Sequence, residues 1–174
     1  MDVNFFEYLQ RLEMMAFFSG YPFIYALVIF IFGSKQSKST FGSRLISLLP
    51  FGYALVGTLF LGLQFSNLYP DYSIENIKLN FNEPYLKIWG ILSLLFWIPA
   101  FSKKKVLSLL HSLPFFFFLA KELLLHLFGA ANQSLIHNEM KIYTDSLLLN
   151  TGCFFLIAAC YLLFKHFNRG ASAN

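Results

Sequence analysis

The sequence predicts an all-α integral membrane bundle of five transmembrane helices, with the N-terminus outside and the C-terminus in the cytoplasm. Three observations support this fold class: composition, five apolar runs, and charge that alternates between the links. Hydrophobic residues make up 57% of the 174 residues and charged residues only 13%, against about 25% charged residues in soluble domains. A chain this small has too much surface for its volume to hide so much apolar material from water.

The apolar runs are the predicted membrane helices of a single domain, residues 1–174. They cover residues 14–33, 45–66, 84–101, 106–128 and 146–164. A helix needs roughly 20 residues to cross about 30 Å of hydrocarbon. Each run is expected to be helical because lipid offers no partner for an open backbone. The run 84–101 is the weakest of the five, since it is short and contains Lys87.

The basic residues predict the orientation. Eight of them stand in the links after the first and third runs and in the tail after the fifth: Lys35, Lys38, Arg44, Lys103, Lys104, Lys105, Lys165 and Arg169. These three segments contain no acid, whereas the other links and the leading segment contain every acidic residue except Glu122. Basic links stay in the cytoplasm. The two lysine-bearing links can share one side only if the run 84–101 also crosses.

The two longer links, 67–83 and 129–145, are predicted outer loops with structure of their own. Residues 77, 79 and 81 are apolar at alternate positions, which is typical of a short strand-like or interfacial segment. Residues 136, 140 and 143 share one helical face, which indicates a short amphipathic helix on the outer surface. Residues 3, 6, 9 and 12 have a similar spacing before the first run.

The sequence lacks the familiar motifs of soluble chemistry. It has no P-loop, GxGxxG, CxxC, HExxH or GxSxG pattern. No basic stripe interleaves with aromatic residues outside the membrane-flanking positions, so no nucleic-acid partner is expected. Cys153 and Cys160 lie within one apolar run and are interpreted as packing residues. We therefore expect no enzyme activity, no cofactor and no metal.

One predicted intramembrane polar site stands out, in the fourth run. It contains His111, Lys121, Glu122 and His126, and each ionisable residue in a membrane helix costs roughly 2.5–3.5 kcal/mol on insertion scales. Glu122 and His126 are four residues apart and share a face. At about 100° per residue, His111 falls about 20° from that face and Lys121 about 100° to one side. Gln64, Asn150 and Thr151 are the polar residues of the neighbouring runs and are expected at a similar depth.

Two interpretations of this site remain open. In the first, Glu122 pairs with Lys121 or His126. Its role is then only to fix how the helices pack or to bind a partner subunit. In the second, Glu122 is a proton or cation site, His126 relays protons to the outside, and His111 lies on the inner path. Burial raises the pKa of a carboxyl and lowers that of an imidazole, which suits proton transfer. The first interpretation is favoured because no other run contains an acid.

The expected function is that of a non-enzymatic subunit or accessory protein of a larger inner-membrane complex. Such a protein binds the lipid bilayer and other membrane protein subunits through its helix faces and outer loops. The first alternative is a small proton- or ion-coupled transporter or channel component that uses Glu122 with His126 and His111. A membrane enzyme acting on lipid ranks last, because His111, His126 and His137 have no paired nucleophile or metal-ligand spacing.

Overall fold

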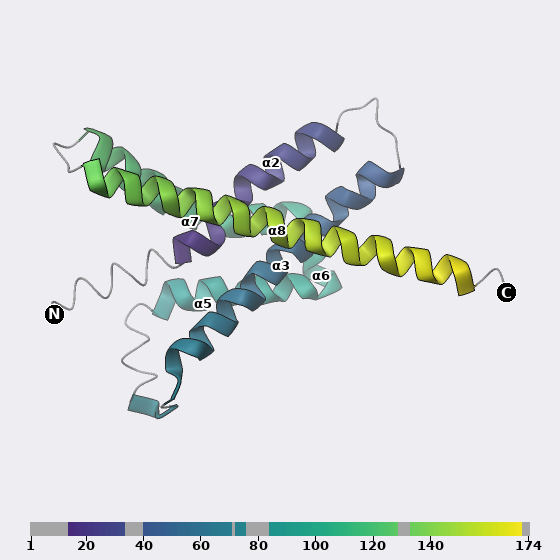
Figure 1. Ribbon diagram of the computed structural model, residues 1–174, viewed down its shortest axis with the longest axis horizontal. Coiled ribbons are helices and arrows are strands. Elements are labelled where there is room, and N and C mark those ends of the chain that lie inside the picture. The colour runs from purple at the N-terminus through teal and green to yellow at the C-terminus, as the bar shows by residue number, and fades with distance from the viewer. Residues whose placement is uncertain (1–13, 34–39, 71, 76–83, 129–132, 172–174) are drawn as a thin grey trace.

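The computed structural model describes residues 14–33, 40–70, 72–75, 84–128 and 133–171, and the regular elements in these ranges are all helical. A helical segment at 14–18 comes first. The helices that follow are α2 (Tyr21–Phe32), α3 (Thr40–Leu68), α5 (Pro84–Leu92), the 3₁₀ helix η1 (Ser93–Trp97), α6 (Pro99–Ser102), α7 (Lys105–Phe128) and α8 (Gln133–Ala171) (Figure 1). The predicted all-α class is confirmed for the described residues.

Four helices in the described part of the chain are long and apolar enough to cross a membrane. They are Met14–Phe32, Phe41–Leu68, Lys105–Leu125 and Met140–Phe167. These spans correspond to four of the five predicted runs. The segments at residues 1–13 and 76–83, for which helical and alternating patterns were predicted, lie outside the described residues.

The remaining predicted run, the third (84–101), is helical but broken. It forms α5, then η1, and only after the extended residue Ile98 the short helix α6, which begins at Pro99. Proline cannot continue a helix from the residues before it, because it lacks an N–H and its ring clashes with an earlier carbonyl. Together α5 and η1 rise about 24 Å, short of the roughly 30 Å of hydrocarbon.

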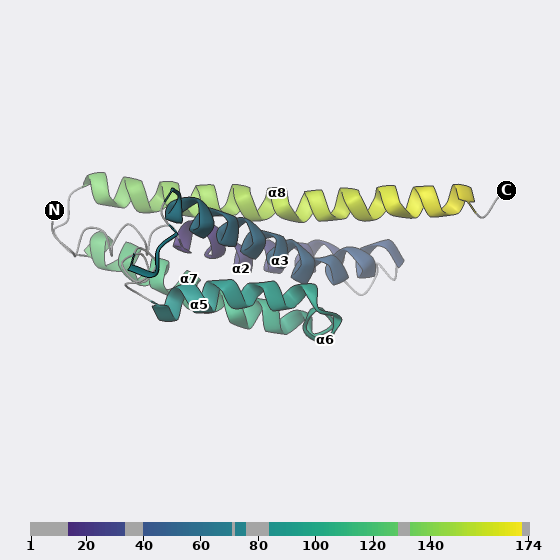
Figure 2. The same cartoon turned by 90° about the horizontal axis from the view of Figure 1, so that it is seen from below.

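Successive helices run in opposite directions along one common axis. In Figure 2, α2 and α8 run toward the end where the C-terminus lies, and α3 and α7 run back. The segment from α5 to α6 lies beside α7 and is joined to it by a tight turn at Lys103 and Lys104. This turn, the end of α2 and the beginning of α3 all lie toward the end to which α8 runs.

Helix α3 is the centre of the bundle, because it contacts every other helix from α2 to α8. Aromatic rings fill the space around it. Phe18 packs edge-on against Phe60 with ring centroids 5.3 Å apart, and stacks on Phe115 at 4.7 Å. Tyr53 lies 4.4 Å from Tyr21 by the same measure. The Phe-rich composition is thus used partly for the internal core, and not only for the lipid-facing surface.

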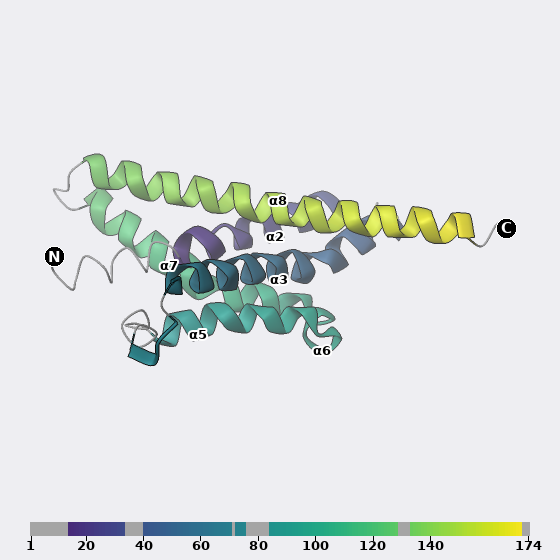
Figure 3. The same ribbon diagram turned by 60° about the horizontal axis from the view of Figure 1, so that its bottom comes forward.

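Helix α8 is continuous from Gln133 to Ala171. The predicted outer loop therefore differs from the structure: from residue 133 onward it is the first part of α8 and not a separate short helix. No Gly or Pro occurs between residues 133 and 151 to stop the helix. Its 39 residues span about 58 Å, and its C-terminal turns extend past the neighbouring helices (Figures 2 and 3).

The first span is interrupted where α8 crosses it. The helical segment 14–18 ends in a turn at Ser19 and Gly20, and α2 begins at Tyr21 with Pro22 in its first turn. A side chain on Gly20 would begin only 2.7 Å from the backbone of Ser146 and Leu147. Only glycine permits this approach of the two backbones.

We expect Gly20→Ala to lower the stability of the bundle, because its methyl group would meet the backbone of α8. Overpacking of this kind costs about 1–3 kcal/mol. Thermal unfolding in a mild detergent should therefore show a clearly lower midpoint for this variant. Gly62→Ala is the matched control, since nothing lies within 4 Å of its added carbon. Equal midpoints for the two variants would contradict the close approach at Gly20.

Candidate functional site

Two clusters of buried polar side chains occupy the interior of the described bundle. The first lies where α8 crosses the break in the first span. The Gly20 N–H donates to Ser146 Oγ at 2.8 Å, and Asn150 Nδ2 donates to the carbonyl oxygens of Phe17 at 2.7 Å and Ser146 at 2.8 Å. A helix that ends inside an apolar layer leaves backbone groups without partners. Here α8 supplies those partners.

The second cluster surrounds His111 on α7. His111 Nδ1 is hydrogen-bonded to the Tyr53 hydroxyl at 2.8 Å. The Trp89 ring lies parallel to the imidazole, with centroids 4.8 Å apart and planes 4° apart, and its indole N–H donates to the His111 carbonyl oxygen at 2.9 Å. Phe96 meets the imidazole edge-on. Residues of α3, α5 and η1 therefore hold this histidine in one orientation.

A polar stripe on α7 extends from His111 by one turn. Ser108 lies three residues earlier on the same face, and its hydroxyl is hydrogen-bonded to the Tyr21 hydroxyl at 2.8 Å. Ser108 and Ser112 also donate to carbonyl oxygens of their own helix. The stripe joins α7 to α2 and α3 through two tyrosine hydroxyls, so it acts in helix packing.

An open pocket of about 280 Å³ lies beside His111, lined by Trp89, Leu92, Leu95, Phe96, Phe101, Leu107, Leu110 and His111. Its lining is apolar apart from the histidine and the indole. His111 Nε2 is buried without a protein partner among the described residues. A small pocket with this lining suits an apolar group.

The predicted site around Glu122 is described only in part. Glu122 and His126 lie on the last turns of α7, but their side chains lie outside the described residues. Lys121 is exposed, in agreement with a side chain that reaches away from the bundle. His111 is bound to Tyr53 on α3. A proton path from His111 through Glu122 to His126 therefore stays a prediction.

The other predicted polar residues, Asn150, Gln64 and Thr151, have different surroundings in the bundle. Asn150 is bound to Phe17 and Ser146, as above, while its side-chain oxygen has no partner in the described part of the structure. Gln64 is buried on α3, and its Nε2 likewise lacks a described partner. Thr151, next to Asn150, lines an apolar groove between α2, α3 and α8.

Sequence reasoning missed several residues of these clusters. Tyr53, Trp89 and Ser146 gave no signal, because a single tyrosine, tryptophan or serine in an apolar run is ordinary. Lys87, the charge that weakens the prediction for the run 84–101, is only 3% exposed. Buried ionisable residues in membrane segments are functional candidates, so Lys87 belongs on that list.

The described residues include no group of three His, Cys, Asp or Glu side chains that could hold a metal ion. Cys153 is buried and Cys160 is exposed, and both are free thiols. Comparison with protein families, with curated proteins and with solved structures finds no match to this chain. The fold itself defines the class: an all-helical protein with four helices suited to crossing a membrane.

Replacing Asn150 with Leu should destabilise the bundle, because the Phe17 carbonyl would lose its donor from α8. Hydrogen bonds between membrane helices contribute about 0.6–2 kcal/mol. Chemical or thermal unfolding in detergent should show a loss of that size. Thr144→Val is the control, since the Thr144 hydroxyl donates to the Met140 carbonyl of its own helix. If the two variants unfold alike, the Asn150 contact does not stabilise the crossing.

Proposed function

We propose that this protein is a non-enzymatic, multi-pass subunit or accessory protein of a larger inner-membrane complex. The chain crosses the membrane five times, with the N-terminus outside and the C-terminus in the cytoplasm. The opposite directions of successive helices support this arrangement. So does the turn between α6 and α7, which contains Lys103 and Lys104 and lies toward the same end of the bundle as the C-terminus of α8 (Figure 2).

The count of crossings depends on the broken segment from α5 to α6. It is tightly fitted into the bundle: Ser93 packs directly on Gly57 of α3, and the Trp97 indole N–H donates to Thr58 Oγ1 at 3.0 Å. Gly90 faces the rings of Phe18 and Phe60. A segment packed in this way beside α3 shares the depth of that helix, which supports a crossing despite its short helical length.

Labelling of single cysteines tests this topology. With Cys153 and Cys160 replaced by alanine, cysteine is introduced at Tyr72 or at Lys104, both exposed. A membrane-impermeant maleimide should label position 72 in intact cells, and position 104 only after the membrane is permeabilised. Labelling of both positions from the same side would contradict the crossing of residues 84–101.

The projecting end of α8 is the observation that carries the proposed role. A helix of 39 residues exceeds by about 19 residues what the hydrocarbon requires. Phe164 and Phe167, near its end, are each 73% exposed. Large apolar side chains that gather on an exposed surface mark interaction sites, and aromatic residues are the usual anchors of protein interfaces. A partner subunit that packs on this end would cover both rings.

Photo-crosslinking in native membranes tests the partner directly. A benzophenone amino acid at Phe167 should yield one discrete protein adduct, and Phe164→Ala should reduce its yield about tenfold or more, as for an interface hot spot. Phe155 is the matched control, because it is 65% exposed, close to the 73% of Phe167, but lies in the middle of α8. Lipid adducts alone at Phe167, or a protein adduct only at Phe155, would refute a partner at this end.

The two alternatives stay predictions. The transporter depends on Glu122, and pH-dependent flux in liposomes that disappears in Glu122→Gln would support it over a subunit role. The lipid enzyme depends on histidines, of which His111 is committed to Tyr53 and Trp89 within the bundle. Neither alternative draws on the projecting end of α8.

A further inference from the structure

We propose that the groove between α2, α3 and α8 binds one acyl chain of an anionic phospholipid, with the head group held by Lys165 and Arg44. The groove has a volume of about 550 Å³, within the roughly 300–1,000 Å³ of ligand pockets. Thr151 is the one polar side chain among its described lining residues, and the rest are aliphatic or aromatic. Its occupant must therefore be apolar along most of its length.

The shape of the groove selects a hydrocarbon chain over a helix. On α8 it extends from Leu147 to Leu162, which is about 22 Å at the rise of a helix. A volume of about 550 Å³ spread over that length makes a narrow groove. A helix with side chains is about 10–12 Å across and is too wide to enter. One leaflet is about 15 Å deep, so a complete acyl chain fits.

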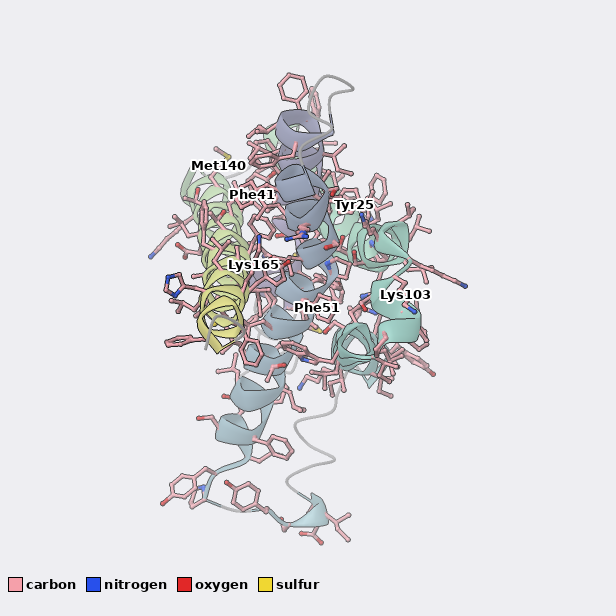
Figure 4. The ribbon with its side chains drawn as sticks, turned by 90° about the vertical axis from the view of Figure 1, so that its right-hand side faces the viewer. Tyr25, Phe41, Phe51, Lys103, Met140 and Lys165 are labelled. Carbon is pink, nitrogen blue, oxygen red and sulfur yellow. The ribbon has the colours of Figure 1, made fainter. Side chains whose placement is uncertain are left out.

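Two cations stand at the end of the groove toward the C-terminus of α8. Lys165 follows Leu162 by three residues and Ala158 by seven, so it shares the α8 face that lines the groove. Arg44 follows the lining residue Phe41 by three residues and is its neighbour on the surface of α3. Figure 4 looks onto this end and shows Lys165 between α8 and the beginning of α3, on the side of Phe41.

The charge around this end selects an anionic head group. Helices α2 and α3 contain no Asp or Glu, and α8 contains none after Asp145. A zwitterionic head group brings a cation of its own, for which these helices offer no acidic partner. An anionic head group meets two cations at the depth where it would lie. Each Lys or Arg near an anionic lipid surface raises binding about fivefold.

Native mass spectrometry of the purified full chain in a mild detergent tests the proposal. The probes are phosphatidylglycerol and phosphatidylcholine with identical acyl chains. We expect the wild-type protein to retain one phosphatidylglycerol and to prefer it over phosphatidylcholine. Lys165→Gln combined with Arg44→Gln should lower retention of phosphatidylglycerol by about fivefold for each charge removed, and leave that of phosphatidylcholine unchanged.

Two matched controls separate the groove from general surface effects. Lys103→Gln with Lys104→Gln removes two cations near the same end of the bundle, on the opposite side from Lys165 (Figure 4), and should not change retention. Leu162→Trp narrows the groove and should abolish retention, whereas Leu163→Trp, on the exposed side of α8, should not. Lys103, Lys104, Leu162 and Leu163 are all exposed. Their replacement should therefore leave the core of the bundle intact.

Four results would overturn the proposal. Equal retention of the two lipids by the wild type would mean that Lys165 and Arg44 do not select the head group. If the Lys103/Lys104 variant lost as much phosphatidylglycerol as the Lys165/Arg44 variant, the effect would be one of general surface charge. Dimers that carry no lipid, or retention unchanged in Leu162→Trp, would mean that the groove is covered by a second copy or by nothing.

Discussion

The bundle depends on the place where α8 crosses the break in the first span. An interrupted helix inside lipid exposes backbone groups that have no water to bind. Ser146 and Asn150 satisfy these groups from α8, and Gly20 allows the two backbones to approach closely enough for it. The crossing in turn sets the direction in which α2 leaves, and so the position of the groove between α2, α3 and α8.

The second determinant is the set of contacts around α3. Its tyrosine and phenylalanine rings meet α2, α7 and the 3₁₀ helix at one level, and Tyr53 reaches His111 through a hydrogen bond. The small residues Gly57 and Gly90 bring the broken third segment close to this core. A proline-broken segment is thus held in place by lateral packing, because its helix is interrupted at the extended residue Ile98.

The fold class was predictable because the apolar runs are long, and hydrophobic length is a strong signal in a membrane protein. The four full-length spans follow from it. The break at Ser19 and Gly20 was not predictable in this way, since Pro22 alone indicates a bend but not what satisfies the freed carbonyls. Of the polar residues, His111 was found because an ionisable group is conspicuous in an apolar run. Its partners Tyr53 and Trp89 were missed, because contacts between distant segments leave no pattern in a single sequence.

Helix α8 is one continuous, stiff rod that is held to the first span near one third of its length. The crossing at Ser146 divides it into an arm of about 20 Å toward Gln133 and one of about 38 Å toward Ala171. An unbroken helix resists bending, so a tilt about this fulcrum displaces the far tip about twice as much as the near one. A displacement of Gln133 would therefore be about doubled at Ala171, at the opposite end of the bundle.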